Sequence, residues 1–209
     1  MYEKVYYIKS EEPGEIPAYR LSERYIMNYG QIIYTDVANG IGCRTSLFVS
    51  GCTHHCKGCF NEMTWDFNYG ELFTKAVEDE IIESLKPAYI NGITILGGEP
   101  MEVINQKVLC PFIKRIKKEL PQKSIWIYSG YTWEELNDNT NKRCNSADTN
   151  DILKNIDILV DGEFILDKKD LMLRFRGSSN QRVIDVQETL KTGSVVLSKY
   201  NDRDESRKA

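Results

Sequence analysis

Residues 45–60 read TSLFVSGCTHHCKGCF, and this stretch decides the fold because a strand in it runs directly into a group of cysteines. Its first six residues, Thr45 to Ser50, are rich in β-forming side chains, which predicts a buried strand. Cys52, Cys56 and Cys59 follow in a Cys-x3-Cys-x2-Cys pattern. Ligands of parallel sheets gather at the carboxyl ends of the strands, so this order of features indicates a binding site built on a sheet.

Three cysteines on one loop can direct three thiolates at a single centre. Thiolates are soft ligands that favour iron-sulfur clusters, zinc or Cu(I). A cubane iron-sulfur cluster normally takes four thiolates, so three leave one iron open to another ligand. The alternatives are a zinc site completed by His54 or His55, and a loop of unligated thiols. Both histidines lie between Cys52 and Cys56 and reach the same metal only with strain, so we expect them on the loop surface or beside the ligands.

A glycine-containing turn follows the next predicted strand. Residues 92–96, GITIL, predict a strand, and Gly97-Gly98-Glu99-Pro100 comes directly after it. Glycines have no Cβ atom, so they allow the backbone to approach a ligand closely. Taken alone, this tetrapeptide indicates only a turn. Its combination with the cysteine loop favours a role in the same site.

The rest of the chain alternates predicted strands with predicted helices. Strands are expected over residues 32–37, 124–128 and 157–160, a turn over 39–42, and an edge strand or hairpin from 182–186 and 194–197. Helices are expected over residues 73–86 and 108–120, where Pro111 must start a turn or kink the helix, and Thr132 with Glu135 predicts a capped short helix. Residues 137–150 lack apolar periodicity and predict an exposed loop. This alternation indicates an α/β fold with a mainly parallel sheet.

Composition is that of an ordinary globular protein. The 209 residues favour one domain, expected over residues 26–200, between an extension of residues 1–25 that carries EEPGEIP and a flexible tail of residues 201–209. Lys and Arg number 27 against 31 Asp and Glu, and the resulting net charge of -4 argues against a nucleic-acid partner. No apolar run is long enough for a signal peptide or a membrane span, so we expect a cytoplasmic protein with no membrane partner.

The six cysteines divide into a group of three and three scattered residues, Cys43, Cys110 and Cys144. Six cysteines could close three disulfides, but in a reducing cytosol a tight group is more often a metal or catalytic site. The scattered cysteines are therefore not expected to be ligands.

Several short segments carry a resemblance to a known family. In chain order they are NGIG (39–42), LFVSGC (47–52), GCFN (58–61), TW (64–65), GGEP (97–100), YSGY (128–131), VDG (160–162) and RGSSNQR (176–182). Together they resemble the radical S-adenosylmethionine enzymes, and within them the activating proteins of the anaerobic ribonucleotide reductase. The resemblance extends over roughly residues 28–197 and implies an incomplete (β/α) barrel with mainly parallel strands.

The resemblance also implies a set of ligands. In that family the three cysteines, here Cys52, Cys56 and Cys59, bind a 4Fe-4S cluster whose remaining iron takes the amine and carboxylate of S-adenosylmethionine. By the same likeness Gly97 and Gly98 lie against the methionyl end of the cofactor, Glu99 orients its amine, and Gly58 and Phe60 contact it through backbone atoms. Many members carry an aromatic residue before the third cysteine to contact adenine. Gly58 stands there in this sequence, so the adenine contact is left open.

The activity that the resemblance implies is radical generation on another protein. An electron from a reduced flavodoxin-like donor passes through the cluster, S-adenosylmethionine is cleaved to methionine and a 5′-deoxyadenosyl radical, and that radical takes a hydrogen from a glycine of the anaerobic ribonucleoside-triphosphate reductase. The short chain fits this, since it has no second domain to enclose a small substrate. Alternatives are an activase of another glycyl-radical enzyme, a small-molecule radical enzyme, and a non-catalytic zinc-binding interaction module.

Four other matched or neighbouring segments have two interpretations each. Residues 129–131 either meet the ribose or the methionine carboxylate or form a turn into the capped helix, and Asp161-Gly162 has the same two interpretations. Residues 176–182 form either a partner contact or a solvated loop. Trp65 and Phe67 form either a partner-facing patch or part of the core.

Overall fold

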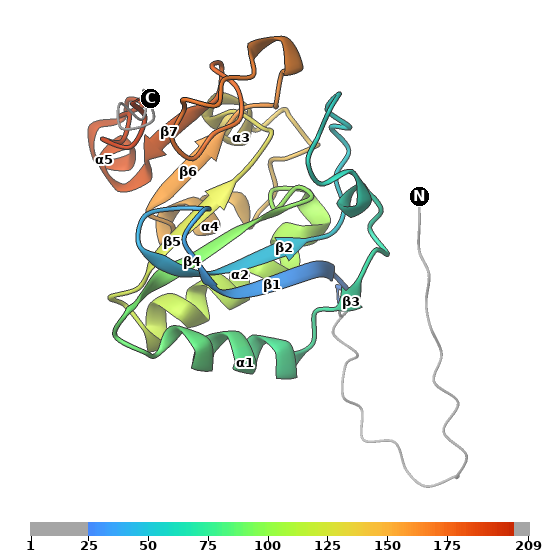
Figure 1. Ribbon diagram of the computed structural model, residues 1–209, viewed down its shortest axis with the longest axis vertical. Coiled ribbons are helices and arrows are strands. Elements are labelled where there is room, and N and C mark those ends of the chain that lie inside the picture. The colour runs from blue at the N-terminus through green and yellow to red at the C-terminus, as the bar shows by residue number, and fades with distance from the viewer. Residues whose placement is uncertain (1–24, 203–209) are drawn as a thin grey trace, which may run out of the picture.

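The computed structural model describes residues 25–202, and its centre is an open seven-stranded sheet (Figure 1). The predicted extension and tail lie outside the described residues, apart from Tyr25, Asn201 and Asp202, and their boundaries stay predictions. Across the sheet the strands follow the order β3-β1-β2-β4-β5-β6-β7. They are β1 (Asn28–Asp36), β2 (Cys43–Val49), β3 (Glu71–Leu72), β4 (Ile90–Gly97), β5 (Ser124–Tyr128), β6 (Ile158–Asp161) and β7 (Arg182–Asp185).

The middle of the sheet is parallel and its edges are antiparallel. β2, β4, β5 and β6 pair in parallel, whereas β1 pairs antiparallel with β2 and β3, and β7 pairs antiparallel with β6. Parallel pairing needs a long crossover, and the short loop between β1 and β2 cannot supply one. The α/β class is therefore confirmed, while the sheet is mixed. The expected barrel is not confirmed, because the sheet does not close.

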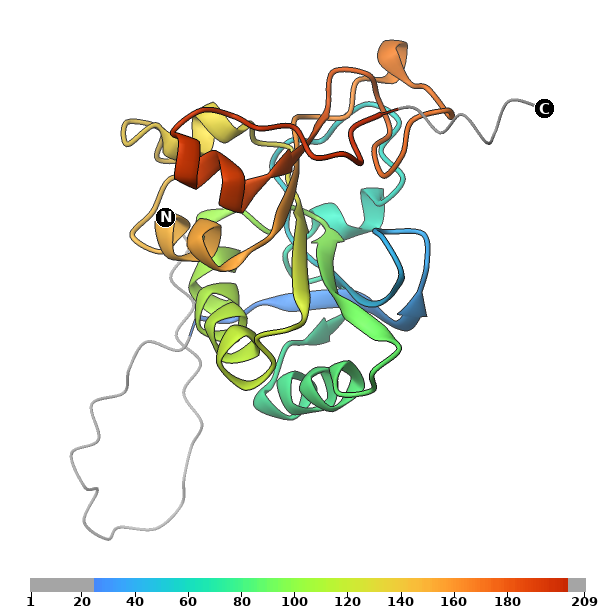
Figure 2. The same cartoon turned by 90° about the vertical axis from the view of Figure 1, so that its left-hand side faces the viewer.

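Helices lie along one side of the sheet, as the turned view shows (Figure 2). α1 begins after Thr74, whose hydroxyl accepts a hydrogen bond from the Val77 N–H at 3.3 Å. The predicted capping box of Thr132 and Glu135 is present at the start of α3. The helices are α1 (Lys75–Leu85), α2 (Val103–Glu119), α3 (Trp133–Asn137), α4 (Thr149–Asn155) and α5 (Val186–Thr192), with 3-10 turns at Glu62–Trp65 and Leu166–Lys168.

Alternate strand residues supply two apolar layers. Ile93, Ile95 and Ile127 belong to the large core between the sheet and the helices. Trp126 and Val160 point to the other face, where Phe175 and Tyr200 pack against them. Period-two alternation thus gives each central strand one face for the helices and one for the segments that follow β6 and β7.

Two regions differ from their predicted structure. α2 begins at Val103 and continues through Pro111, so the proline starts no turn. Residues 137–150 are not simply an exposed loop, since Cys144 is fully buried and α4 begins at Thr149. The Gln106 side chain of α2 causes this, because its amide donates to the Cys144 carbonyl at 2.6 Å and accepts from the Thr149 hydroxyl at 2.7 Å. Apolar periodicity cannot reveal such a polar anchor.

A buried arginine lies at the amino end of the central strands. Arg44 is fully buried, and its guanidinium donates to Thr94 Oγ1 at 2.7 Å, Ile93 O at 2.6 Å and Ser124 O at 3.0 Å. It also lies 5.2 Å from the Trp126 ring centre. Burial lowers the pKa of Arg44 to about 10, which leaves it charged at neutral pH.

In the described part of the chain, no helix has the length and apolarity to cross a bilayer.

Candidate functional site

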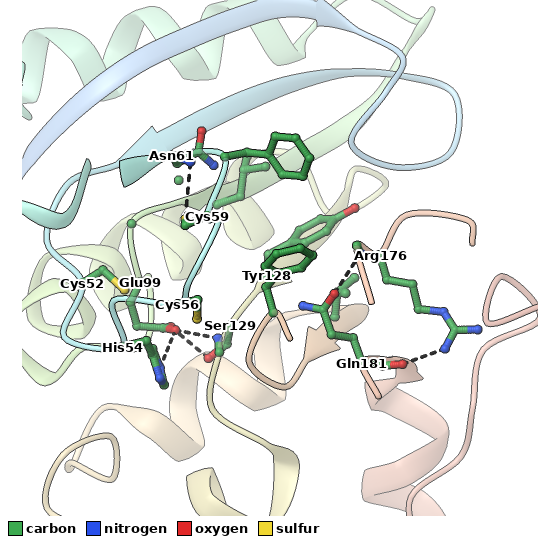
Figure 3. A pocket seen from close by; sticks show the side chains of 18 of the residues that line it. Cys52, His54, Cys56, Cys59, Asn61, Glu99, Tyr128, Ser129, Arg176 and Gln181 are labelled. Carbon is green, nitrogen blue, oxygen red and sulfur yellow. Dashed lines mark hydrogen bonds and ion pairs between the residues drawn. The ribbon is translucent and has the colours of Figure 1, made fainter. Parts of the chain in front are cut away.

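A cavity of about 530 Å³ lies where β2, β4, β5 and β6 end, on the face away from the helices (Figure 3). Seven of the eight predicted cofactor-binding and metal-binding residues line it: Cys52, Cys56, Cys59, Phe60, Gly97, Gly98 and Glu99. Gly58 is exposed, with φ +75°, and is not part of the wall. Cys52 and Gly97 are 45 residues apart in the sequence. The sheet thus brings the cysteine loop and the glycine turn to one place.

Backbone hydrogen bonds fix the start of the cysteine loop. Gly51 N donates to Thr64 O at 2.7 Å, and Cys52 N donates to Trp65 O at 3.1 Å. Gly51 has φ +94°, and a Cβ there would lie 2.2 Å from the Phe67 ring. Phe67 therefore packs against the loop that carries the first cysteine. Its neighbour Trp65 lines the cavity.

The three thiols differ in burial. Cys52 is 8% exposed, and burial raises the pKa of its thiol to about 12. Burial also raises the pKa of Cys56, although a hydrogen bond from the Phe164 backbone N–H opposes it. Cys59 Sγ accepts from Asn61 N at 3.4 Å. A buried thiol becomes a thiolate readily only beside a cation, so binding iron would release these protons.

The two histidines of the loop do not complete a metal site with the cysteines. His55 stacks on Trp65, with ring centres 4.6 Å apart and planes at 10°. Both ring nitrogens of His54 face carboxylates. Within residues 25–202 no three Cys, His, Asp or Glu side chains converge on a single ion. A cubane cluster takes each thiolate on a different iron, so cysteines spaced around a cavity fit it better than a single zinc ion.

The glycine pair is required by the protein's own backbone. A Cβ on Gly97, which has φ +107°, would lie 2.8 Å from the Phe48 backbone, and one on Gly98 would lie 2.6 Å from Gly51 O and 2.8 Å from Thr64 O. Both contacts are closer than real Cβ atoms make. From the sequence alone, these glycines are expected to allow close approach of a ligand. In the structure they allow the glycine turn to touch β2 and the cysteine loop.

Glu99 is a buried carboxylate with all its partners in the protein. It is 1% exposed and Oε1 accepts from Ser129 Oγ and Met101 N, each at 2.8 Å. Oε2 accepts from Gly130 N at 2.6 Å and lies 3.2 Å from Nε2 of His54. Ser129 and Gly130, predicted as either ligand contacts or a turn, therefore hold Glu99 and also line the cavity.

His54 is held between two acids. Its side chain is 4% exposed, and Nδ1 lies 2.6 Å from Glu163 Oε1. Burial alone would lower the pKa of His54, but Glu99 and then Glu163 outweigh it and raise the pKa to about 9. At neutral pH the ring is therefore a cation that partly neutralises the buried Glu99.

The rest of the wall includes apolar groups and two unpaired donors. Trp65 Nε1 and Arg176 Nε are buried without a hydrogen-bond partner in the structure. Buried donors normally have an acceptor, so these two favour a ligand that carries hydrogen-bond acceptors. Arg176, Gly177 and Gln181 of the 176–182 segment line the cavity, so this segment is not simply a solvated loop, and its contact with a partner stays a prediction. The wall residues that the sequence analysis did not assign include Phe48, His54, Leu96, Tyr128, Val160 and Phe164.

Some of these had a signal in the sequence. Tyr128 and Val160 end predicted strands, and strand ends are where ligands bind in parallel sheets. His54 lies inside the cysteine loop. Phe164 had no such signal, because only the return of the chain after β6 brings it to Cys56.

Comparison with known proteins identifies the family. A family model described as a 4Fe-4S single cluster domain matches residues 38–184. The anaerobic ribonucleoside-triphosphate reductase-activating protein of Haemophilus influenzae is 45% identical over 157 residues, 74% of this chain and 96% of the relative. The protein of that name from Escherichia coli K12 is 44% identical over 159 residues, 75% and 97% of the two chains. The one from Enterobacteria phage T4 is 36% identical over 159 residues, 75% and 93%. This chain, in which residues 38–184 match a 4Fe-4S single cluster domain, therefore belongs to the family of anaerobic ribonucleoside-triphosphate reductase-activating proteins.

Proposed function

We propose that this protein binds a 4Fe-4S cluster through Cys52, Cys56 and Cys59, binds S-adenosylmethionine beside it, and places a glycyl radical on an anaerobic ribonucleoside-triphosphate reductase. The observation that carries the proposal is the shared cavity, in which the three cysteines and the glycine turn with Glu99 line one wall. The names of the relatives support the partner. The electron donor in this proposal is a reduced flavodoxin-like protein, and the reaction takes place in the cytoplasm.

The bound groups would supply the radical chemistry: one electron from the reduced cluster cleaves the sulfonium of S-adenosylmethionine to methionine and a 5′-deoxyadenosyl radical, which takes a hydrogen atom from a glycine of the reductase. The protein would contribute binding and orientation. Three thiolates leave one iron open, and the cavity beside them has room for a small cofactor.

Each predicted cofactor contact has a role in this proposal. Glu99 would attract the cofactor's ammonium group, since its carboxylate is buried in the cavity wall and fixed by Ser129 and Gly130. Gly97 and Gly98 would offer backbone atoms to the methionyl end. Phe60 follows the third cysteine and would contact the cofactor through its backbone from the cavity wall. Gly58, which precedes that cysteine, stays a predicted contact, although it does not line the cavity.

The cavity's surroundings suit a reaction with another protein. Phe48, Leu96 and Val160 give the wall an apolar surface beside the place where the bound groups would lie. The Phe60 ring is 76% exposed while also lining the cavity. It therefore marks an opening at which a loop of the reductase can enter.

The test is an anaerobic reaction of cluster-loaded protein with a reductant, S-adenosylmethionine and the reductase. We expect little cofactor cleavage without the reductase, and with it 5′-deoxyadenosine together with the doublet electron paramagnetic resonance spectrum of a glycyl radical. A reductase whose candidate glycine is replaced by alanine is the control. Equal radical with the alanine variant would contradict the proposal, and so would full turnover triggered by a small metabolite or by a different glycyl-radical enzyme alone.

A further inference from the structure

The His54 imidazole joins three segments that are far apart in the sequence. It lies in the cysteine loop, and Nε2 is 3.2 Å from Glu99 after β4 (Figure 3). Nδ1 is 2.6 Å from Glu163 after β6. The ring also packs against Tyr131, with ring centres 4.3 Å apart. A Cβ on Gly130 would lie 2.7 Å from it. The ring thus has a single position, set by neighbours on every side.

The two acids that hold His54 differ in their own support. Glu99 is buried and has hydrogen bonds from Ser129, Gly130 and Met101, so its position does not depend on the histidine. Glu163 has a side chain that is 54% exposed. Its carboxylate therefore has less support from the surrounding protein, and its contact with His54 is a bridge from outside the core to the cysteine loop.

The residue after Glu163 reaches the same loop a second time. The Phe164 N–H donates a hydrogen bond to the Cys56 thiol. The Glu163 carbonyl accepts from the Asn180 side chain at 2.8 Å, which fixes this backbone to the 176–181 segment. Residues 163–164 therefore contact both His54 and Cys56, two positions apart in the cysteine loop.

We infer that Glu163 is a positioning residue that, through His54, holds the cysteine loop against the ends of β4 and β6 and so fixes Cys56 for cluster binding. The inference rests on the proposed function, since it concerns the loop that would carry the cluster. Groups that orient metal ligands from behind typically change metal affinity about 10-fold or more when they are removed. Thr53 N at the start of the loop donates to Glu102 Oε1 at 2.8 Å, and Cys59 N at its end donates to Cys56 O at 3.1 Å. The His54 side chain fixes the loop between these two bonds.

The test compares Glu163→Ala with Glu163→Gln and with Asp167→Ala, which removes an exposed acid from the same segment. Each protein is reconstituted anaerobically, and iron release to a chelator is followed by absorbance. We expect release about 10-fold faster from Glu163→Ala. Glu163→Gln keeps an oxygen that can accept from Nδ1 and should restore slow release, and Asp167→Ala should match the unchanged protein. The reduced cluster's electron paramagnetic resonance spectrum should broaden in Glu163→Ala alone.

Each outcome decides the inference. Equal release rates and spectra for Glu163→Ala and the unchanged protein would overturn it, and so would a Gln variant as defective as the Ala variant. Urea denaturation of the cluster-free proteins separates positioning from folding, because an exposed residue that only positions the loop should leave the midpoint unchanged. If the unchanged protein holds no cluster at all, the proposed function fails first, and this result is distinct from a failure of Glu163.

Discussion

Both ends of the central strands bury polar groups. Donors at the amino end have acceptors in the protein, whereas two donors at the carboxyl end have none. At the amino end, the Arg44 guanidinium donates to Thr94, Ile93 and Ser124, and the Lys123 ammonium donates to Pro87 O at 2.8 Å and Ile90 O at 2.5 Å. At the carboxyl end, by contrast, Trp65 Nε1 and Arg176 Nε are buried without partners, and the three thiols surround a cavity.

This difference separates stability from binding. A buried donor with its acceptor in the protein contributes to folding, whereas one left unpaired costs about 1–3 kcal/mol until a ligand supplies the acceptor. The amino end is therefore expected to set the free energy of unfolding, and the carboxyl end to set ligand affinity. The same division holds in related α/β architectures, where ligands bind at the carboxyl ends of the strands.

The largest expected effect is at the carboxyl end. Cys56→Ala should remove the cluster completely, because a cubane with only two thiolates from the loop is not held. Iron and sulfide analysis after anaerobic reconstitution measures this. Cys110→Ala and Cys144→Ala are the controls and should load normally, since both thiols are buried away from the cavity wall. A fully loaded Cys56→Ala protein would contradict the cluster assignment.

The next effect tests the amino end. Arg44→Met leaves several buried acceptors without a donor, so we expect the free energy of unfolding to fall by about 3 kcal/mol. Urea denaturation of the cluster-free protein measures the loss, and Lys118→Met, which removes an exposed cation, is the matched control. Cluster loading of the Arg44 variant at low temperature should be unchanged. A large loss of cluster with unchanged stability would break the division between the two ends.

Gly98→Ala should affect both the stability of the fold and the binding of the cluster, because Gly98 lies where the glycine turn contacts the cysteine loop. Its Cβ would lie 2.6 Å from Gly51 O, so the loop must shift, at a cost of about 2 kcal/mol, as expected for overpacking. We expect lower stability and faster loss of iron to a chelator.

Gly193→Ala is the matched control for this substitution. Gly193 has φ +74° and no atom within 4 Å of an added Cβ, so its substitution introduces backbone strain without a collision. It should lower stability slightly and leave iron release unchanged. Equal iron release from the two variants would show that contact of the glycine turn with the loop has no role in holding the cluster.

The smallest effect concerns pH at the amino end. Burial would raise the pKa of Asp36, but hydrogen bonds from Ser46, Ala38 and Asn39 outweigh it and hold the pKa below the ordinary 3.8. A depressed folded-state pKa stabilises the protein above the unfolded-state value, and this contribution disappears as the pH falls through the folded-state value. Asp36→Asn should therefore lose less stability than the unchanged protein between neutral pH and a pH below 3.8. Urea midpoints at both pH values measure this, and identical losses would rule out the linkage.

Local patterns predicted a large part of the fold. The strand predicted over 124–128 is β5, and those predicted over 92–96 and 157–160 match β4 and β6 within two residues. Such strands are short apolar runs bounded by turn residues, so the signal is local. α5 was missed, although Asp185 and Gly193 cap its two ends. The strand predicted over 182–186 extends one residue beyond β7 into the first residue of this helix.

The sequence by itself determined the candidate ligands and their place. Three cysteines at that spacing, directly after a strand, specify a soft-metal loop at a strand end, because spacing and strand propensity act over a few residues. Tertiary structure alone decided what surrounds the loop. It placed Glu163 on His54 across 109 residues and gave Gly97 and Gly98 their contacts with β2 and the loop. It also left the sheet open. Contacts between distant segments depend on how the whole chain packs, and no local pattern encodes them.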